Sequence, residues 1–146
     1  MAKREATAGH DTARSKLIAC ATSLFNRRGY AATSVREIVA AAGVTKPVLY
    51  YYFGSKEGIY REMMEHLRAH FEESLAAFRR ERGRAAKRVL RLCDDLFSVF
   101  LRHTEYVRLM YSIYFGPTQG APFVDAEAFY DKLYKAVRQA VQQGIR

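Results

Sequence analysis

The feature that most limits the possible folds of this chain is an apolar stripe along its middle. Apolar side chains recur there at every fourth residue, at Ile59, Met63, Leu67, Phe71 and Leu75. This spacing predicts one face of a long α-helix, over about residues 55–82, which must pack against neighbouring helices to bury the stripe. Only three prolines and nine glycines interrupt the 146 residues, so helical patterns continue on both sides and predict an all-α fold.

The same periodicity and the turn residues between the patterns divide the rest of the chain. Further helices are expected over residues 13–28, 34–42, 45–52, 84–103, 105–115 and 125–143. Residues 116–122 combine glycine and proline and predict a loop. Residues 1–12 are small or charged without apolar periodicity, so we expect a flexible basic arm there.

Charge and composition narrow the class of protein. The net charge is +9, and the excess is greatest at the N-terminus, where residues 1–60 hold nine basic and four acidic side chains. A basic surface suits either the phosphates of nucleic acid or an anionic membrane. Because no apolar run approaches the ~20 residues of a membrane span, we expect no membrane partner and a cytoplasmic location. Cys20 and Cys93 are predicted to be reduced thiols of the core.

Residues 34–53 carry the most specific local pattern. Ser34 followed by Glu37 fits a capping box at the start of a helix. Gly43 can take the positive φ of a tight turn, Thr45 can cap the next helix, and Pro47 falls in that helix's first turn. Two short helices joined by a glycine turn within about 20 residues predict a helix-turn-helix. Structural αα-hairpins share this spacing.

The order of these residues adds a resemblance. Gly29-Tyr30, then Thr33-Ser34-Val35-Arg36-Glu37-Ile38, then the run from Ala42 to Glu57 resemble the DNA-binding domain of the TetR/AcrR family of bacterial transcriptional regulators. The resemblance implies a DNA-binding domain over residues 13–58 and a helical effector-binding domain over residues 59–146. It further implies a bacterial, nucleoid-associated repressor that a small-molecule effector releases from its operator, and not an enzyme.

In the family the second helix of the motif enters the major groove. The expected base-reading residues are Arg36, Thr45, Lys46 and Val48, which offer cations for guanine edges and an apolar contact for a thymine methyl. The expected phosphate contacts are Thr33, Ser34, Tyr50, Tyr51, Tyr52 and Lys56. Three consecutive tyrosines cover too wide an arc for all to face DNA, so we favour Tyr50 and Tyr52 and expect one ring to pack inside.

The later helices could hold the small apolar or aromatic effector. Aromatic and methionine side chains predict a pocket lined by Phe97, Phe100, Tyr106, Met110, Tyr111, Tyr114, Phe115, Phe123, Phe129, Tyr130 and Tyr134. Aromatic stripes at helical spacing also occur as plain core. The family implies a homodimer on double-stranded, palindromic DNA, yet the chain ends directly after the helix over 125–143, without the two helices that usually dimerise.

Other classes of function stay open at this point. An architectural protein that binds DNA by charge alone would also be basic, and a partner-binding helical module would use the hairpin structurally. His66 and His70 lie one helical turn apart but lack the metalloprotease pattern, so we expect solvated histidines, no metal and no cofactor. We find no phosphate-binding glycine loop and no nucleophile elbow that would indicate an enzyme.

Overall fold

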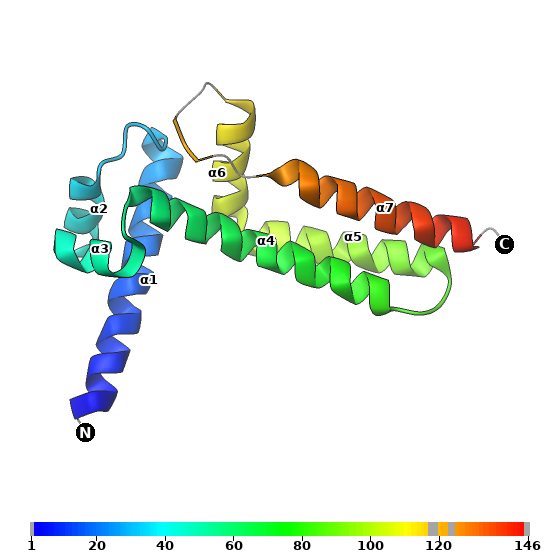
Figure 1. The fold of residues 1–146 in the computed structure, drawn as a ribbon, viewed down its shortest axis with the longest axis horizontal. Coiled ribbons are helices and arrows are strands. Elements are labelled where there is room, and N and C mark those ends of the chain that lie inside the picture. The colour runs from blue at the N-terminus through cyan, green and yellow to red at the C-terminus, as the bar shows by residue number, and fades with distance from the viewer. Residues whose placement is uncertain (1, 117–119, 123–124, 145–146) are drawn as a thin grey trace. The chain divides into compact units, whose positions relative to one another are not determined.

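The computed structural model describes residues 2–116, 120–122 and 125–144, with side chains from residue 12 onward except that of residue 126. All regular structure in these ranges is helical, which confirms the all-α prediction (Figure 1). The helices are α1 (Ala2–Arg28), α2 (Val35–Ala42), α3 (Lys46–Phe53), α4 (Lys56–Arg80), α5 (Ala85–Arg102), α6 (Thr104–Phe115) and α7 (Ala126–Gly144).

Two compact units make up the chain. The first unit contains Met1–Met64 and Glu105–Pro122, and the second contains Glu65–Thr104 and Phe123–Arg146. Helix α4 contributes its first part to the first unit and the remainder to the second. The expected boundary near residue 58 therefore falls near the start of a continuous helix.

The first unit is built on α1, which packs against α2 and α3 (Figure 1). Its predicted inward face is buried, at Leu17, Ala21, Leu24 and Phe25. Ile38 of α2 and Leu49 of α3 are fully buried. Helix α6 belongs to the same unit, where Leu109 is fully buried and the Asn26 side-chain amide donates to the Glu105 carbonyl at 3.0 Å. Short helices are thus held by tertiary contacts rather than by their own length.

The second unit has its own apolar cluster, formed by α4, α5 and α7. Its buried members are Leu75, Phe78, Leu92, Ala136 and Ala140. The Phe71 ring packs against Phe100 and Phe129, each at a centroid distance of 5.3 Å. Lys132 of α7 donates to Glu72 of α4 at 2.7 Å. The stripe from Ile59 to Leu75 is buried throughout, as predicted, although it serves two units.

Two expectations differ from the structure. Helix α1 begins at Ala2, so residues 2–12 continue the helix where we expected a flexible arm. That segment contains the strong helix formers Ala, Lys, Arg and Glu and no proline, which accounts for the extension without any apolar periodicity. Cys93 is exposed, so its assignment to the core was wrong, whereas Cys20 is half-buried; both cysteines are free. Helix α5 presents Cys93 on its outer side because Leu92 faces the cluster.

No helix in the described ranges is both long enough and apolar enough to cross a membrane.

Leu49→Ala tests the packing of the first unit. Because Leu49 is fully buried, we expect the free energy of unfolding to fall by about 2 to 5 kcal/mol, measured by urea denaturation. Leu101→Ala is the matched control, since that leucine is 79% exposed and its loss should change stability by no more than about 0.5 kcal/mol. Equal losses in the two variants would contradict the described core.

Candidate nucleic-acid interface

Helix α2 begins with the capping box that the sequence predicts. Ser34 has the extended conformation of an N-cap, with φ −100° and ψ 155°. The Glu37 backbone N–H donates to Ser34 Oγ at 3.2 Å, and the Ser34 N–H donates back to Glu37 Oε2 at 2.8 Å. Two backbone donors at the helix start are satisfied in this way, which fixes where α2 begins.

A glycine turn connects α2 to α3. Gly43 has φ 67° and ψ 33°, the left-handed conformation that residues with a Cβ rarely adopt. The Val44 N–H donates to the Val39 carbonyl at 3.0 Å and closes the turn. Thr45 then takes the N-cap position of α3, but its side chain makes no capping hydrogen bond. The predicted helix-turn-helix geometry is present, and the Thr45 hydroxyl is not used to cap the helix.

Glu37 also ties α2 to the end of α1. Arg28 Nη1 forms an ion pair with Glu37 Oε1, while the other carboxylate oxygen stays in the capping box. The hydrogen bond from the Ser34 backbone, helped by the Ser34 hydroxyl and by Arg28, lowers the pKa of the Glu37 carboxyl. This carboxylate is therefore a structural group of the motif.

Lys56 holds the start of α4 against the segment between α1 and α2. Its ammonium donates to the carbonyls of Tyr30 and Thr33, both at 2.8 Å, and lies 4.2 Å from the centre of the Tyr30 ring. Burial lowers the pKa of this lysine. We predicted Lys56 as a phosphate contact, but two of its three N–H groups are committed to the fold.

Thr33 and Ser34, the other predicted phosphate contacts before α2, are also engaged internally. Thr33 is 1% exposed, and its hydroxyl donates to the Gly29 carbonyl at 2.9 Å. Ser34 is exposed, but its hydroxyl donates to Glu37 at 2.8 Å. The predicted capping box already paired Ser34 with Glu37, whereas the Thr33 contact was not predicted, because threonine suits caps, backbone contacts and phosphates alike.

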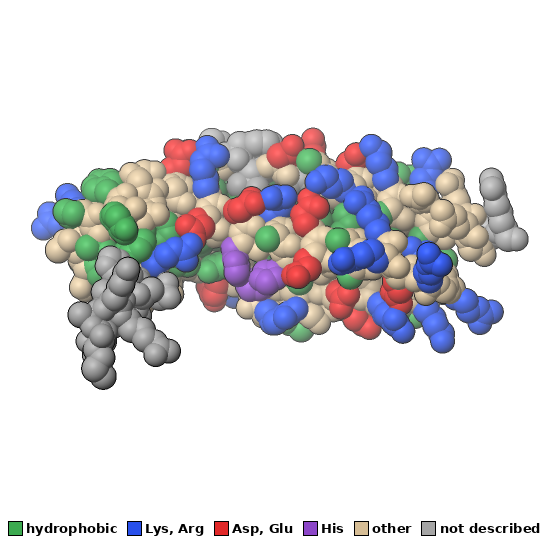
Figure 2. Space-filling view, turned by 60° about the horizontal axis from the view of Figure 1, so that its bottom comes forward, with side chains coloured by type: hydrophobic (Ala, Val, Ile, Leu, Met, Phe, Trp, Pro, Cys, Tyr) green, Lys and Arg blue, Asp and Glu red, His purple; other side chains and the backbone are tan. Residues whose placement is uncertain are grey.

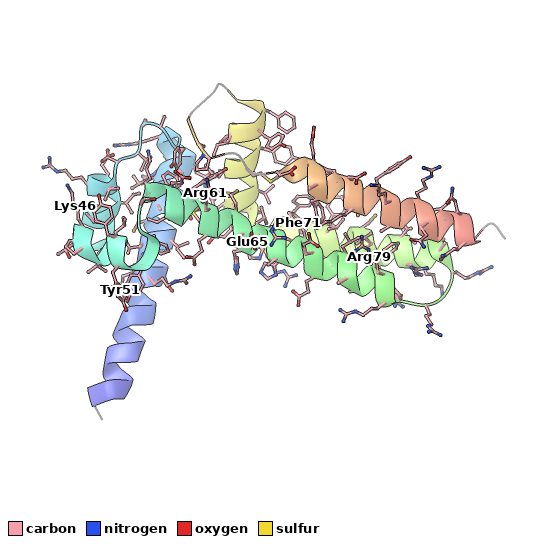
Figure 3. The ribbon with its side chains drawn as sticks, in the orientation of Figure 1. Lys46, Tyr51, Arg61, Glu65, Phe71 and Arg79 are labelled. Atoms are coloured by element: carbon pink, nitrogen blue, oxygen red, sulfur yellow. The ribbon has the colours of Figure 1, made fainter. Side chains whose placement is uncertain are left out.

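The predicted base-reading residues divide into three exposed side chains and one half-buried one. Arg36, Thr45 and Lys46 are exposed, whereas Val48 is half-buried. Figure 3 labels Lys46 at the start of α3. Within the described part of the chain, Arg36 and Lys46 have no hydrogen bond or ion pair, so both cations are available to an external anion or base edge.

The three tyrosines of α3 point in different directions. Tyr51 is 75% and Tyr50 49% exposed, whereas Tyr52 is half-buried, with its ring 5.0 Å from that of Tyr51 and 6.1 Å from that of Phe53. The expected inward tyrosine is thus Tyr52, one of the two that we favoured for phosphate. Tyr52 follows the buried Leu49 by three residues and shares its helix face.

The predicted effector-pocket residues are distributed over both units. Met110, Tyr111, Tyr114 and Phe115 belong to the first unit, and Phe97, Phe100, Phe129, Tyr130 and Tyr134 to the second. Tyr106 lies in the first unit as well, and Phe123 lies outside the described residues. Phe97, Phe115 and Tyr134 are each more than 60% exposed. Phe100 and Phe129 pack on Phe71 and serve as core.

The second unit also carries a groove of about 1080 Å³ between the start of α5 and the end of α7. Residues 83–90, Ala140, Val141, Gln143 and Gly144 line it. None of the predicted pocket residues is among them, so this groove was not foreseen from the aromatic pattern.

Comparisons with known proteins agree with the geometry. Residues 17–63 match the model of the family described as bacterial regulatory proteins, tetR family. The chain carries the TetR-family N-terminal domain. The matched residues contain the whole α2–turn–α3 motif and the start of α4.

Individual relatives extend the similarity past this TetR-family domain. The transcriptional repressor NicS of Pseudomonas putida is 26% identical over 100 residues, which cover 68% of this chain and 47% of that protein. The probable transcriptional regulator YttP of Bacillus subtilis is 34% identical over 102 residues, 66% of this chain and 47% of that protein. The chain spans about half the length of these curated relatives.

Solved structures share the fold. The TetR-family regulator PfmR from Thermus thermophilus aligns with a TM-score of 0.71 at 23% identity, over 90% of this chain and 70% of that protein. A structure titled as a gamma-butyrolactone receptor aligns with a TM-score of 0.65 at 27% identity, over 89% and 67% of the two chains. The helical arrangement beyond the motif therefore also follows the TetR-family fold.

Glu37→Gln tests the role of the carboxylate. Its folded-state pKa is lowered, so its stabilisation is present above the ordinary glutamate pKa of about 4.3 and is lost as pH falls through the depressed value. We expect the variant to melt below the wild type at pH 7 and the two melting temperatures to converge as the pH falls through the depressed pKa of Glu37. Glu127→Gln, at an exposed position of α7, serves as the control. A melting-temperature difference that stays constant with pH would contradict the assignment.

Proposed function

We propose that this chain is a sequence-specific DNA-binding transcriptional regulator, acting as a repressor that a small-molecule effector releases from its operator. The observation that carries the proposal is the combination of a capped helix-turn-helix with two exposed cations, Arg36 and Lys46, that have no partner within the described residues. The similarity to the regulators described above supports the same function.

In this proposal α3 enters the major groove. Lys46 lies at its first turn and donates to guanine acceptors, and the guanidinium of Arg36 on α2 supplies a fork of further donors. The Thr45 hydroxyl, which makes no capping bond, is free to contact DNA, and the half-buried Val48 offers an apolar edge to a thymine methyl.

Phosphate contacts position the motif without reading sequence. We assign them to Tyr50 and Tyr51 of α3, which are the more exposed of its three tyrosines. Thr33, Ser34, Tyr52 and Lys56 instead keep α2, α3 and α4 in place, because their polar groups or rings are engaged within the unit. They act on DNA only through the geometry that they maintain.

Dimerisation and effector binding belong to the same proposal. We place the chain on a palindromic operator as a homodimer in the bacterial cytoplasm, since paired half-sites mirror a two-fold axis. The similarity to a protein titled gamma-butyrolactone receptor supports a small organic effector as the class of ligand. Part of the predicted aromatic set, Phe97, Tyr130 and Tyr134, remains exposed in the second unit and is the candidate contact surface.

The Lys46→Ala variant tests whether the chain recognises a DNA sequence or binds DNA by charge alone. We would measure fluorescence anisotropy of labelled duplexes from the DNA flanking the gene, against scrambled duplexes, at near-physiological salt. We expect Lys46→Ala to weaken binding to the preferred site by about 10- to 100-fold, the effect of losing one base contact, with a much smaller loss on scrambled DNA. Circular dichroism should show an unchanged melting temperature, because the side chain is exposed.

Lys87→Ala is the matched control, since it removes the same charge from an exposed position of α5 in the second unit. If both variants weaken binding equally on every duplex, the chain is an architectural protein that binds by charge alone. If neither variant changes any affinity, the motif is structural and the chain is a partner-binding module.

A further inference from the structure

Three histidines gather on the second unit, although His103 is far in the sequence from His66 and His70. His66 and His70 lie one turn apart on α4, and His103 follows the last residue of α5. Figure 2 shows histidine side chains together as one patch on the visible face. His66 is exposed and the other two are half-buried, so the patch is open to solvent on one side.

The nitrogen atoms lie at distances suited to a single ion. The Nε2 atoms of His66 and His70 are 3.3 Å apart. Two nitrogens bound to one tetrahedral Zn²⁺, each about 2.0 to 2.1 Å from the ion, lie about 3.3 to 3.4 Å from each other. One ring nitrogen of each histidine lies within 4.8 Å of the others, so His103 needs a small side-chain rotation to close the triangle. Its ring already stacks on His70 at a centroid distance of 4.6 Å.

The Glu73 carboxylate lies near the His70 ring, on the side away from His66. His70 turns its Nε2 toward His66, while its Nδ1 lies 3.8 Å from Glu73 Oε2. In metal sites the second nitrogen of a histidine ligand commonly donates to a carboxylate, which fixes the ring and raises its basicity. Glu73 is placed to do this after a modest approach.

We propose that His66, His70 and His103 form a binding site for one divalent transition-metal ion, best matched by Zn²⁺, with water in the remaining position. Three imidazoles select borderline ions such as Zn²⁺, Co²⁺ or Ni²⁺ over Mg²⁺ and Ca²⁺, which prefer oxygen ligands. Bound there, the ion joins α4 to the end of α5 within the second unit. This proposal does not rest on the DNA binding or the organic effector proposed above.

The test uses the 146-residue chain without an added histidine tag. Zn²⁺ binding is measured by isothermal titration calorimetry, and Co²⁺ binding by its visible absorption. We expect one ion per chain, an intense tetrahedral Co²⁺ spectrum and a higher melting temperature in Zn²⁺. His103→Gln and His66→Gln should each weaken binding by at least about tenfold, and Glu73→Gln by about 10- to 100-fold.

His10→Gln is the matched control, because His10 belongs to the first unit, and it should leave Zn²⁺ affinity unchanged. His66 is exposed, so its variant should keep the fold even if His103→Gln does not. Absence of Zn²⁺ and Co²⁺ binding would overturn the proposal. Wild-type affinity in a folded His103→Gln would also overturn it, since α4 alone would then hold the ion.

Discussion

The first unit depends on the burial of two short helices against a long one. Helices α2 and α3 have eight residues each, too few to be stable in water by their own hydrogen bonds. Ile38 and Leu49, both fully buried, hold them on α1. Everything that α3 presents outward, including Lys46 and Tyr51, is therefore positioned by apolar contacts on its opposite face.

In the first unit, polar interactions set where the short helices begin and how the chain enters them. The capping box of Ser34 and Glu37 sets the first residue of α2, and Gly43 sets the angle at which the chain enters α3. Lys56 then joins α4 to the carbonyls that precede α2. Since each of these groups is engaged within the unit, the side chains that remain for a ligand are the few without an internal partner.

In the second unit, α4 contributes side chains both to an apolar cluster and to a polar one. Phe71 and Leu75 contribute to an apolar cluster with α5 and α7, whereas His66 and His70 lie beside His103. Because a helix repeats every 3.6 residues, one element can supply both a core and a polar cluster. Lys56, which anchors the motif, lies in the part of α4 that belongs to the first unit, and His66 and His70 lie in the part that belongs to the second.

The sequence by itself determined the helices other than the first part of α1, the turn at Gly43 and the capping box, because these follow from residues within a few positions of one another. It did not determine which hydroxyls and cations would be free. Lys56 looked suitable for phosphate, yet its partners are backbone carbonyls 26 and 23 residues away, which only the fold brings within reach. Tyr52 rather than Tyr51 turned inward, a choice made by the face of α3 that packs. The pairing of His103 with His66 and His70 depended on how α4 and α5 lie together, which no local pattern encodes.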